Sequence, residues 1–300
     1  YSIDDGLGFA AGIGGDWVIL SPTWTASSNS FSPVIAPSPG TDLLWTELMN
    51  LNSHVMMSGQ KSILFPIVNY AQTPETFWSG FSVTDERIIK WNEQYAAFIY
   101  HNADLAQILG IEGLVIGDPS ILSSSSTIND SNELQPVVVN WQELITGIRA
   151  RYSGRLIGTI ILNSNGVIEP DWLDQVDIIY VLFTPEFEDY SASVAELKLE
   201  IDALLLNQLE PIFRKYNKPI ILGFSSASGN TAANIDLDIQ AKSYSAAILS
   251  AASTEWITGF ISRGYLPFVE LQDASSTIYR KPASEILWFW FHYLLGKPPQ

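Results

Sequence analysis

Four acidic residues follow apolar stretches of the sequence and are candidates for acid–base chemistry: Asp118, Glu186, Glu270 and Asp273. A carboxyl group half-buried at the end of a strand has a raised pKa and can protonate a leaving oxygen. We take Asp118 as the candidate proton donor and Glu186 as its base or nucleophile, with Glu270 or Asp273 as alternatives. Each also has a structural interpretation. Asp118 begins an Asp-Pro turn, Glu186 opens an acidic loop, and Asp273 can cap a turn.

Arg263 is the cation most suited to a site, because it stands just past the apolar run 256–261. A guanidinium buried there must pair with a carboxylate or a ligand oxygen, since an unpaired buried charge is costly. A structural ion pair with Asp118 or Glu186 is the alternative. Hydrogen-bonding groups and aromatic rings at other strand ends extend the candidate binding set to Asn69, Asn163, Trp24, Tyr70, Tyr265, Glu270 and Asp273.

The elements that position these residues alternate along the chain. Residues 256–291 show the repeated unit: an apolar strand, a polar loop, and a helix that begins near Pro282, where proline is tolerated. Apolar runs predict seven strands, at residues 17–22, 62–68, 113–117, 156–162, 176–183, 219–222 and 256–261. Helices are predicted between them, at residues 42–57, 84–109, 141–152, 192–216 and 239–252. This order is typical of a parallel sheet covered by helices on both faces.

The fold class expected from this order is α/β, as a single-domain (β/α)₈ barrel over residues 1–300. Such a barrel uses about 250 residues as one domain. Its first strand is expected upstream of Tyr1, or else in a segment that is not predicted as a strand here. A doubly wound open sheet is the rival, but no GxGxxG motif follows an early strand and no P-loop is present.

Composition limits the partners and the compartment. The net charge of −17 argues against nucleic acid and anionic membranes, since binding phosphates needs clustered Lys and Arg. The chain has no cysteine, which suits a secreted bacterial protein, and no apolar run of membrane-spanning length. Three histidines, His54, His101 and His292, fall on separate predicted helices, so neither a metal site nor a Ser-His-Asp triad is expected. The sequence predicts no cofactor.

Several motifs together resemble a known enzyme family. They are Gly14-Gly15-Asp16-Trp17-Val18, Pro22-Thr23-Trp24, Trp141 with Arg149, Trp172-Leu173-Asp174 with Asp177, Lys218-Pro219-Ile220-Ile221, Gln240 with Tyr244, and Lys281-Pro282-Ala283. Their order is similar to that of the mannanase-type (β/α)₈ glycoside hydrolases, family 113 and its relatives. The pieces Gly259-Phe260-Ile261-Ser262-Arg263-Gly264-Tyr265 and Leu271-Gln272-Asp273 resemble an uncharacterised branch in large bacterial surface proteins.

The resemblance implies a retaining hydrolase with one glutamate at the end of strand four and a second at the end of strand seven. Here the strand-four end has Asp118 after Ile116-Gly117, and the strand-seven end has Phe224 in the expected nucleophile position. Glycoside hydrolysis needs two carboxyl groups, about 5 Å apart for retention and about 6.5–9.5 Å apart for inversion. The family's own pair therefore cannot be transferred to this sequence.

Two functional hypotheses follow. In the first, the chain hydrolyses a β-linked polysaccharide, of mannan type, in the extracellular space or at the cell surface. Asp118 and Glu186 would catalyse, and Arg263, Asn69, Asn163 and Trp24 would hold the sugar. In the second, the barrel has lost catalysis and serves as a carbohydrate-binding or structural module beside other domains of a larger surface protein. Phe224 favours the second hypothesis.

Overall fold

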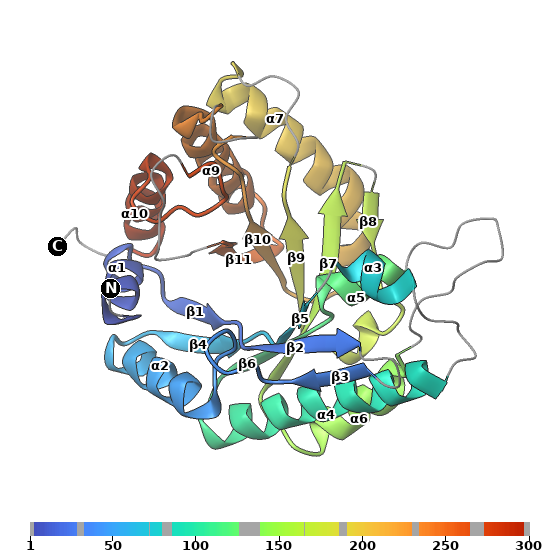
Figure 1. The fold of residues 1–300 in the computed structure, drawn as a ribbon. Coiled ribbons are helices and arrows are strands. Elements are labelled where there is room, and N and C mark those ends of the chain that lie inside the picture. Colours follow the sequence, from blue (N-terminus) through green and yellow to red (C-terminus); the bar gives the residue numbers. More distant parts are fainter. Residues whose placement is uncertain are drawn as a thin grey trace. The chain divides into compact units, whose positions relative to one another are not determined.

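In the computed structural model, whose helices and strands are drawn in Figure 1, the chain forms two compact units. Unit 1 comprises Tyr1–Asp16, Ile160–Glu169 and Ile178–Gln300, and unit 2 comprises Trp17–Thr159 and Pro170–Asp177. The structure describes residues 3–28, 33–71, 73–79, 86–125, 139–164, 166–185, 191–229, 234–264 and 273–296. The expected single domain over residues 1–300 stays a prediction.

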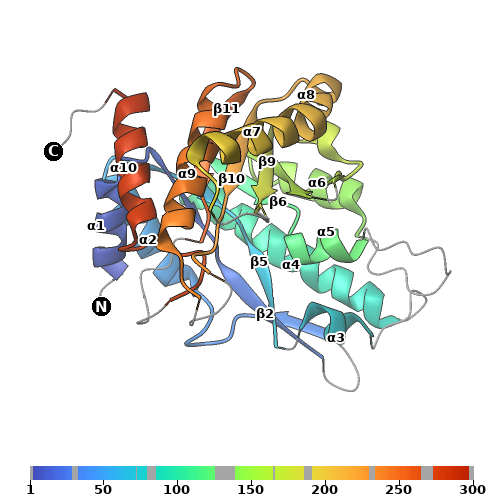
Figure 2. The same ribbon diagram turned by 90° about the horizontal axis from the view of Figure 1, so that it is seen from above.

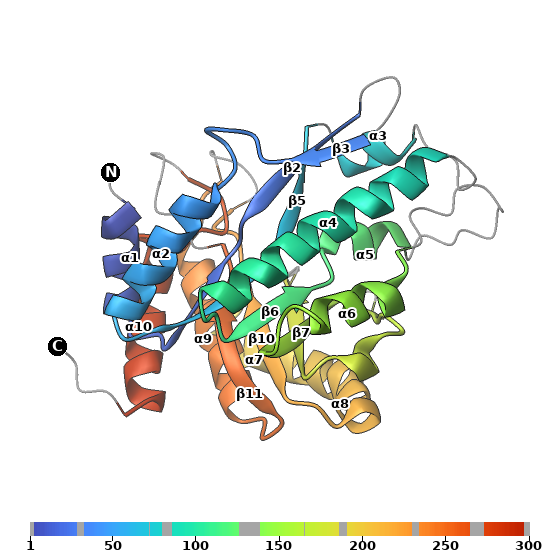
Figure 3. The ribbon, with the colours of Figure 1, turned by 90° about the horizontal axis from the view of Figure 1, so that it is seen from below.

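Unit 2 contains parallel strands in the order β1 (Trp17–Leu20), β4 (Lys61–Leu64), β6 (Gly113–Ile116) and the first part of β7 (Arg155–Asn163). Every residue of β6 is buried, as expected for a strand covered on both faces. Helix α4 lies beside β3 and β6 (Figure 3). The helices of unit 2 are α2 (Trp45–Met57), α3 (Pro74–Ser79), α4 (Glu86–Ile108), α5 (Pro119–Ser125) and α6 (Trp141–Arg149), with the 3₁₀ turn η1 (Leu173–Gln175).

A second, three-stranded sheet in unit 2 differs from the prediction. It consists of β3 (Pro33–Ala36), β2 (Thr23–Ser28) and β5 (Ile67–Tyr70), with β2 antiparallel to β3 and parallel to β5. The predicted strand 62–68 divides into β4 and β5 at Pro66, and the predicted strand 17–22 ends at Leu20, before Pro22, because proline has no N–H to donate to a ladder. The stretch from Thr23 to Gly40, where neither a strand nor a helix is predicted, contains both β2 and β3.

Unit 1 contains the parallel strands β9 (Ile178–Phe183), β10 (Ile220–Phe224) and β11 (Ile257–Ser262), in that order. The short strand β8 (Gly166–Ile168) pairs antiparallel with the end of β7. Helix α9 lies beside α7 and α10 (Figure 2). The helices of unit 1 are α1 (Ile3–Gly12), α7 (Val194–Leu204), α8 (Glu210–Tyr216), α9 (Leu237–Ala252) and α10 (Pro282–Leu294).

Local sequence signals explain where these helices begin and bend. Ser193 and Glu196 form a capping box at the start of α7, and Asp236 accepts two backbone N–H groups at the start of α9. The single helix predicted over residues 192–216 is interrupted by a π-helical turn, η2 (Leu205–Leu209). Pro211, in the first turn of α8, lacks the N–H that a continuous regular helix would require, which explains the interruption.

The predicted alternation of parallel strands and helices is confirmed. Each of the seven predicted strands overlaps a described strand, namely β1, β4, β6, β7, β9, β10 and β11. In the described part of the chain, no helix is both long enough and apolar enough to cross a membrane.

Candidate functional site

Asp118 lies directly after β6 and is 1% exposed. Its Oδ1 accepts hydrogen bonds from the backbone N–H of Ser120 at 2.8 Å and from the Ser120 hydroxyl at 2.6 Å. Its Oδ2 accepts from the backbone N–H of Val68 in β5 at 2.6 Å. The carboxyl group therefore caps the turn that begins α5 and also holds β5 in place.

Burial raises the pKa of the Asp118 carboxyl group, and the hydrogen bonds from Ser120 and Val68 oppose that rise. A raised pKa is the property that a proton donor needs. Burial also raises the pKa of Tyr95, a buried residue of α4, and the negative charge of Asp118 adds to that effect. Asp118 therefore fits both the structural and the catalytic interpretation. Its hydrogen bonds are those of a residue that caps a turn, and its raised pKa is that of a proton donor.

Trp24 and Asn69 lie within strands, whereas the sequence placed them just past strand ends. Trp24, in β2, packs its ring 5.2 Å from the ring of Phe98 and 5.1 Å from that of His101, between ring centroids. Asn69, in β5, is exposed. Tyr70 packs edge-on against Phe77 with centroids 5.1 Å apart.

Asp42 is a buried carboxylate that sequence reasoning missed; it is 4% exposed. It accepts hydrogen bonds from the hydroxyls of Thr23 at 2.6 Å and Thr25 at 2.9 Å, and from the backbone N–H of Ser38 at 2.8 Å. Thr23 and Thr25 share one face of β2 because strand side chains alternate. That Thr-x-Thr spacing was the available signal, but no strand is predicted over that stretch. Asp42 fixes the connection that follows β3.

The end of β10 is occupied by aromatic packing. Phe224 is fully buried and faces α9, where its ring meets Tyr244 edge-on at 4.9 Å between centroids. The opposite face of the strand presents Gly223, where a Cβ would overlap the ring of Tyr180. Ser225 follows and is buried. Gly223, Phe224 and Ser225 include no carboxylate, so this strand end offers no nucleophile of the kind that the resemblance implies.

Arg263 directly follows β11, and its backbone N–H continues the ladder to the carbonyl of Phe224 at 2.8 Å. Its guanidinium donates to the Thr184 hydroxyl at 3.4 Å. Burial raises the pKa of Tyr180, and the positive charge of Arg263 partly opposes that rise. Arg263 and Asp118 belong to different units, so an ion pair between them stays a prediction.

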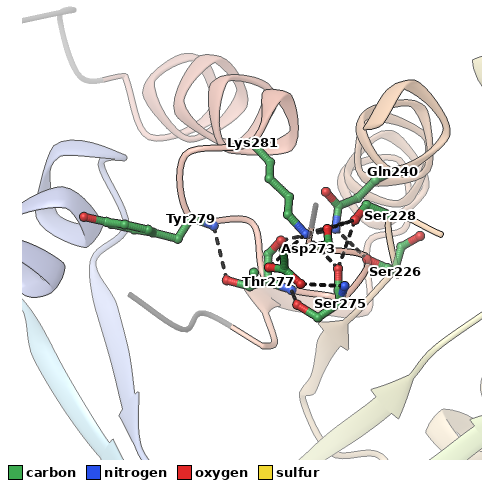
Figure 4. Close-up of polar contacts among 8 residues, drawn as sticks. All are labelled: Ser226, Ser228, Gln240, Asp273, Ser275, Thr277, Tyr279 and Lys281. Carbon is green, nitrogen blue, oxygen red and sulfur yellow. Dashed lines mark hydrogen bonds and ion pairs between the residues drawn. The ribbon is translucent and has the colours of Figure 1, made fainter. Parts of the chain in front are cut away.

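A buried polar cluster joins the loops that follow β10 and β11 (Figure 4). The Lys281 ammonium, whose side chain is 5% exposed, donates to the Ser228 hydroxyl and to the Ser275 carbonyl, both at 2.9 Å. It also lies 3.4 Å from Oδ2 of Asp273, whose side chain is 14% exposed. The Ser228 hydroxyl in turn donates to the Asp273 carbonyl at 2.9 Å. These contacts connect two segments that are distant in sequence.

Gln240 also belongs to the cluster and connects α9 to both loops. The amide of Gln240 in α9 donates to the carbonyl of Ser226 at 2.8 Å and to that of Thr277 at 3.4 Å. Asp273 also caps its own turn, because its Oδ1 accepts the backbone N–H of Ser275 at 2.8 Å. Burial acts to raise the pKa of Asp273, but the bonds from Ser275 and the charge of Lys281 outweigh it and hold the pKa below its ordinary value.

The remaining candidates are only partly described. Asn163, at the end of β7, is half-buried and lies opposite Gly166 of β8. Glu186, Tyr265 and Glu270 lie outside the described residues. Within the described ranges, no group of three or more His, Cys, Asp or Glu side chains is arranged to hold a metal ion.

Replacing Asp118 with Asn is expected to lower the free energy of unfolding by about 2 kcal/mol, because the amide nitrogen faces a backbone donor and leaves it unsatisfied. Equilibrium urea unfolding at pH 7 measures the change. Ser120→Ala is the matched control, since it removes the hydroxyl bond to Asp118 and a long 3.5 Å bond to the Tyr70 hydroxyl but keeps the backbone bonds, and should cost about 1 kcal/mol. If the Asp118→Asn variant is as stable as the wild type, the three hydrogen bonds do not define the turn.

Comparisons with known proteins agree with this fold. The model of Glycoside Hydrolase Family 113 matches residues 9–265. A GH113 β-1,4-mannanase structure superposes with a TM-score of 0.73 and 17% identity, over 97% of this chain and 93% of that one. The GH113 β-mannanase from Alicyclobacillus acidocaldarius superposes with a TM-score of 0.69 and 18% identity, over 97% and 91%. A fungal β-1,4-galactanase gives a TM-score of 0.56 and 11% identity, over 96% and 90%.

No curated protein matches the chain. The solved structures are each less than 25% identical to it, so they establish the fold alone. The family model covers well over half of the sequence. The chain therefore belongs to glycoside hydrolase family 113 and has its (β/α)₈ fold.

Proposed function

We propose that the chain binds a β-linked polysaccharide of mannan type without cleaving it by the two-carboxylate route. The observation that carries this proposal is the end of β10, where Gly223, Phe224 and Ser225 stand and the Phe224 ring is fully buried against α9. The mannan specificity is supported by family membership and by the β-mannanases among the similar structures. An extracellular or cell-surface location, in a larger protein, belongs to the same proposal.

The chemistry explains why a missing carboxylate matters so much. A retaining hydrolase that uses the two-carboxylate route needs a carboxylate nucleophile and a carboxylic acid about 5 Å apart, and Gly223, Phe224 and Ser225 supply no carboxylate. Binding has no such requirement. Hydrogen-bond donors and acceptors at strand ends can still hold sugar hydroxyls. Arg263 and Thr184 provide such groups at the ends of β11 and β9.

A second candidate function is hydrolysis with Asp118 as the proton donor. It is favoured by one observation, the burial that raises the pKa of the Asp118 carboxyl group. This mechanism requires a partner carboxylate, and the predicted partner is Glu186, with Glu270 or Asp273 as alternatives. A raised pKa alone does not make an acid, because structural carboxyls that are buried shift in the same direction.

The experiment combines reducing-end release with direct binding, on mannan, glucan, xylan and chitin. We expect no release from any polymer and measurable binding to mannan. Arg263→Ala should weaken binding about tenfold, equivalent to about 1.4 kcal/mol. Asp118→Asn should leave the affinity of the folded protein unchanged, with circular dichroism confirming that it is folded at the assay temperature.

Two results would contradict this proposal. Release of reducing ends that disappears in Asp118→Asn would establish the hydrolase. Failure to bind any of the four polymers would exclude the binding role itself. Binding to xylan or glucan in preference to mannan would keep the role and correct the ligand.

A further inference from the structure

Arg263 differs from the other cations of unit 1 in its electrostatic partners. Several lysines and arginines in the described part of this unit pair with a carboxylate: Lys198, Arg214, Lys215, Lys242 and Lys281. Arg263 is half-buried, and no carboxylate of the described part of unit 1 pairs with it. Acidic residues outnumber basic ones by 32 to 15 in this chain, so a cation without a carboxylate is unexpected. A half-buried guanidinium in this state is suited to an oxyanion from outside the chain.

The alternation of side chains shows which face of the strands Arg263 occupies. Ser262 lies opposite Phe224 in the ladder between β10 and β11, and its hydroxyl donates to that of Tyr244 in α9 at 3.1 Å. The ladder continues through the N–H of Arg263, which donates to the carbonyl of Phe224 at 2.8 Å. Because successive strand residues point to opposite faces, Arg263 points away from α9.

Two hydroxyl-bearing residues from β9 and its end lie on the same face. The ring of Phe183 packs 5.7 Å from that of Phe224, between centroids, on the α9 side. Thr184 follows Phe183, is exposed, and accepts a hydrogen bond from the guanidinium of Arg263 at 3.4 Å. Tyr180 shares the face of Thr184 by alternation. The charge of Arg263 opposes the rise that burial causes in the pKa of Tyr180, as expected for neighbouring groups.

The backbone of Arg263 is held from both sides. Its carbonyl accepts a hydrogen bond from the Tyr244 hydroxyl at 3.4 Å, in addition to the bond that its N–H donates to Phe224. Gly264 follows with a φ of 78°, and a Cβ there would lie 2.8 Å from the hydroxyl oxygen of Ser276. The guanidinium therefore extends from an ordered backbone, and a ligand that binds it loses little conformational entropy.

We propose that Arg263 binds a carboxylate group carried by the polysaccharide, such as that of a uronic acid residue. The inference rests on the proposed function and narrows its ligand from a neutral mannan to a β-linked polymer that also contains acidic sugars. A guanidinium presents two parallel N–H groups that match the two oxygens of a carboxylate. The Thr184 hydroxyl accepts from Arg263, so its own hydrogen is available to the ligand.

The charge of the protein favours a carboxylate over a phosphate. A carboxylate carries one negative charge and neutralises one guanidinium. A phosphate monoester carries about −1.5 to −2 at neutral pH and would leave excess negative charge on a chain whose net charge is already −17.

Matched polymers test the inference on the intact chain. Mannan oxidised to carboxylates at its primary hydroxyl groups is compared with its methyl ester and with unmodified mannan, which share its backbone. Titration calorimetry at about 0.15 M salt measures the affinities, because charges more than about 8 Å apart are then largely screened. We expect the oxidised polymer to bind about tenfold more tightly than its methyl ester. The methyl ester should bind like unmodified mannan.

A matched pair of variants assigns the preference to one guanidinium. Arg263→Gln should abolish the preference for the oxidised polymer. Arg155→Gln removes an exposed guanidinium at the first residue of β7 and should retain the preference. Arg263→Lys keeps the charge but loses the paired N–H groups, so it should retain only part of the preference.

The outcomes separate this inference from the proposed function. Equal affinity for the oxidised polymer and its methyl ester would overturn the inference alone, and an internal ion pair of Arg263 with Glu186 or Asp118 predicts that result. Binding of none of these polymers would overturn both. Binding of the oxidised polymer alone supports the inference and corrects the neutral ligand. A preference that survives Arg263→Gln contradicts the assignment to this residue, and tighter binding of phosphorylated mannan contradicts the choice of a carboxylate.

Discussion

Replacing Lys281 with Met is expected to lower the free energy of unfolding by about 3–5 kcal/mol, the cost of breaking a buried ion pair from one side. The substitution leaves Asp273 without its cation, and the Ser228 hydroxyl and the Ser275 carbonyl without a donor. Methionine is close to lysine in volume, so packing changes little. Equilibrium urea unfolding at pH 7 measures the loss.

Two companion variants make this result specific. Lys198→Met breaks a partly exposed pair with Asp202, one helical turn away, and should cost no more than about 0.5 kcal/mol. The double variant Lys281→Met with Asp273→Asn removes both charges and should be more stable than Lys281→Met alone. A cost below about 1 kcal/mol for Lys281→Met would mean that the cluster contributes little to stability.

Acid should reduce the contribution of Asp273. The pKa of Asp273 in the folded protein is below the ordinary value of 3.8. Between the lowered pKa and pH 3.8, the folded state therefore binds fewer protons than the unfolded state. The contribution is complete above pH 3.8 and is lost as pH falls through the lowered pKa. The difference in stability between wild type and Asp273→Asn should therefore shrink below pH 3.8.

The order of elements was predictable because it depends on local composition. Buried strands such as β6 and β9 are continuous apolar runs, and they were found close to their true limits. The cap made by Asp273 was also anticipated from its position before small residues. The contact between Lys281 and Ser228 was not anticipated, because these two residues are 53 positions apart and no pattern of spacing connects them. Long-range pairing of this kind requires the fold.

The orientation of side chains at strand ends was the least predictable feature. Phe224 was expected in the nucleophile position, yet its ring faces α9 and packs against Tyr244. Strand side chains alternate, so a shift of one residue in the assumed strand end reverses the face. A fully buried strand gives no polar–apolar alternation from which the face could be inferred. The reason for a glycine at position 223 could not be predicted either, since only the structure shows that the Tyr180 ring lies where a Cβ would be.

Gly117 is the residue at which the second large effect is expected: Gly117→Ala should lower the free energy of unfolding by about 3 kcal/mol. Its φ of 94° costs an L-residue about 1–2 kcal/mol. A Cβ there would also overlap the Thr159 hydroxyl and lie 3.1 Å from the ring of Trp172, adding about 1–3 kcal/mol of overpacking. Urea unfolding again provides the measurement.

Gly110→Ala separates the two causes, because Gly110 also has a positive φ, 64°, but has no atom within 4 Å of an added Cβ. Gly110→Ala should lower the free energy of unfolding only by the cost of placing an alanine at a positive φ, about 1 kcal/mol. Equal costs for the two variants would show that Trp172 and Thr159 move aside freely. If Gly117→Ala costs more, the turn that positions Asp118 is rigidly packed from two sides. A carboxyl group held in that way suits a structural cap better than an acid that must meet a substrate. The comparison therefore bears on function as well as on stability.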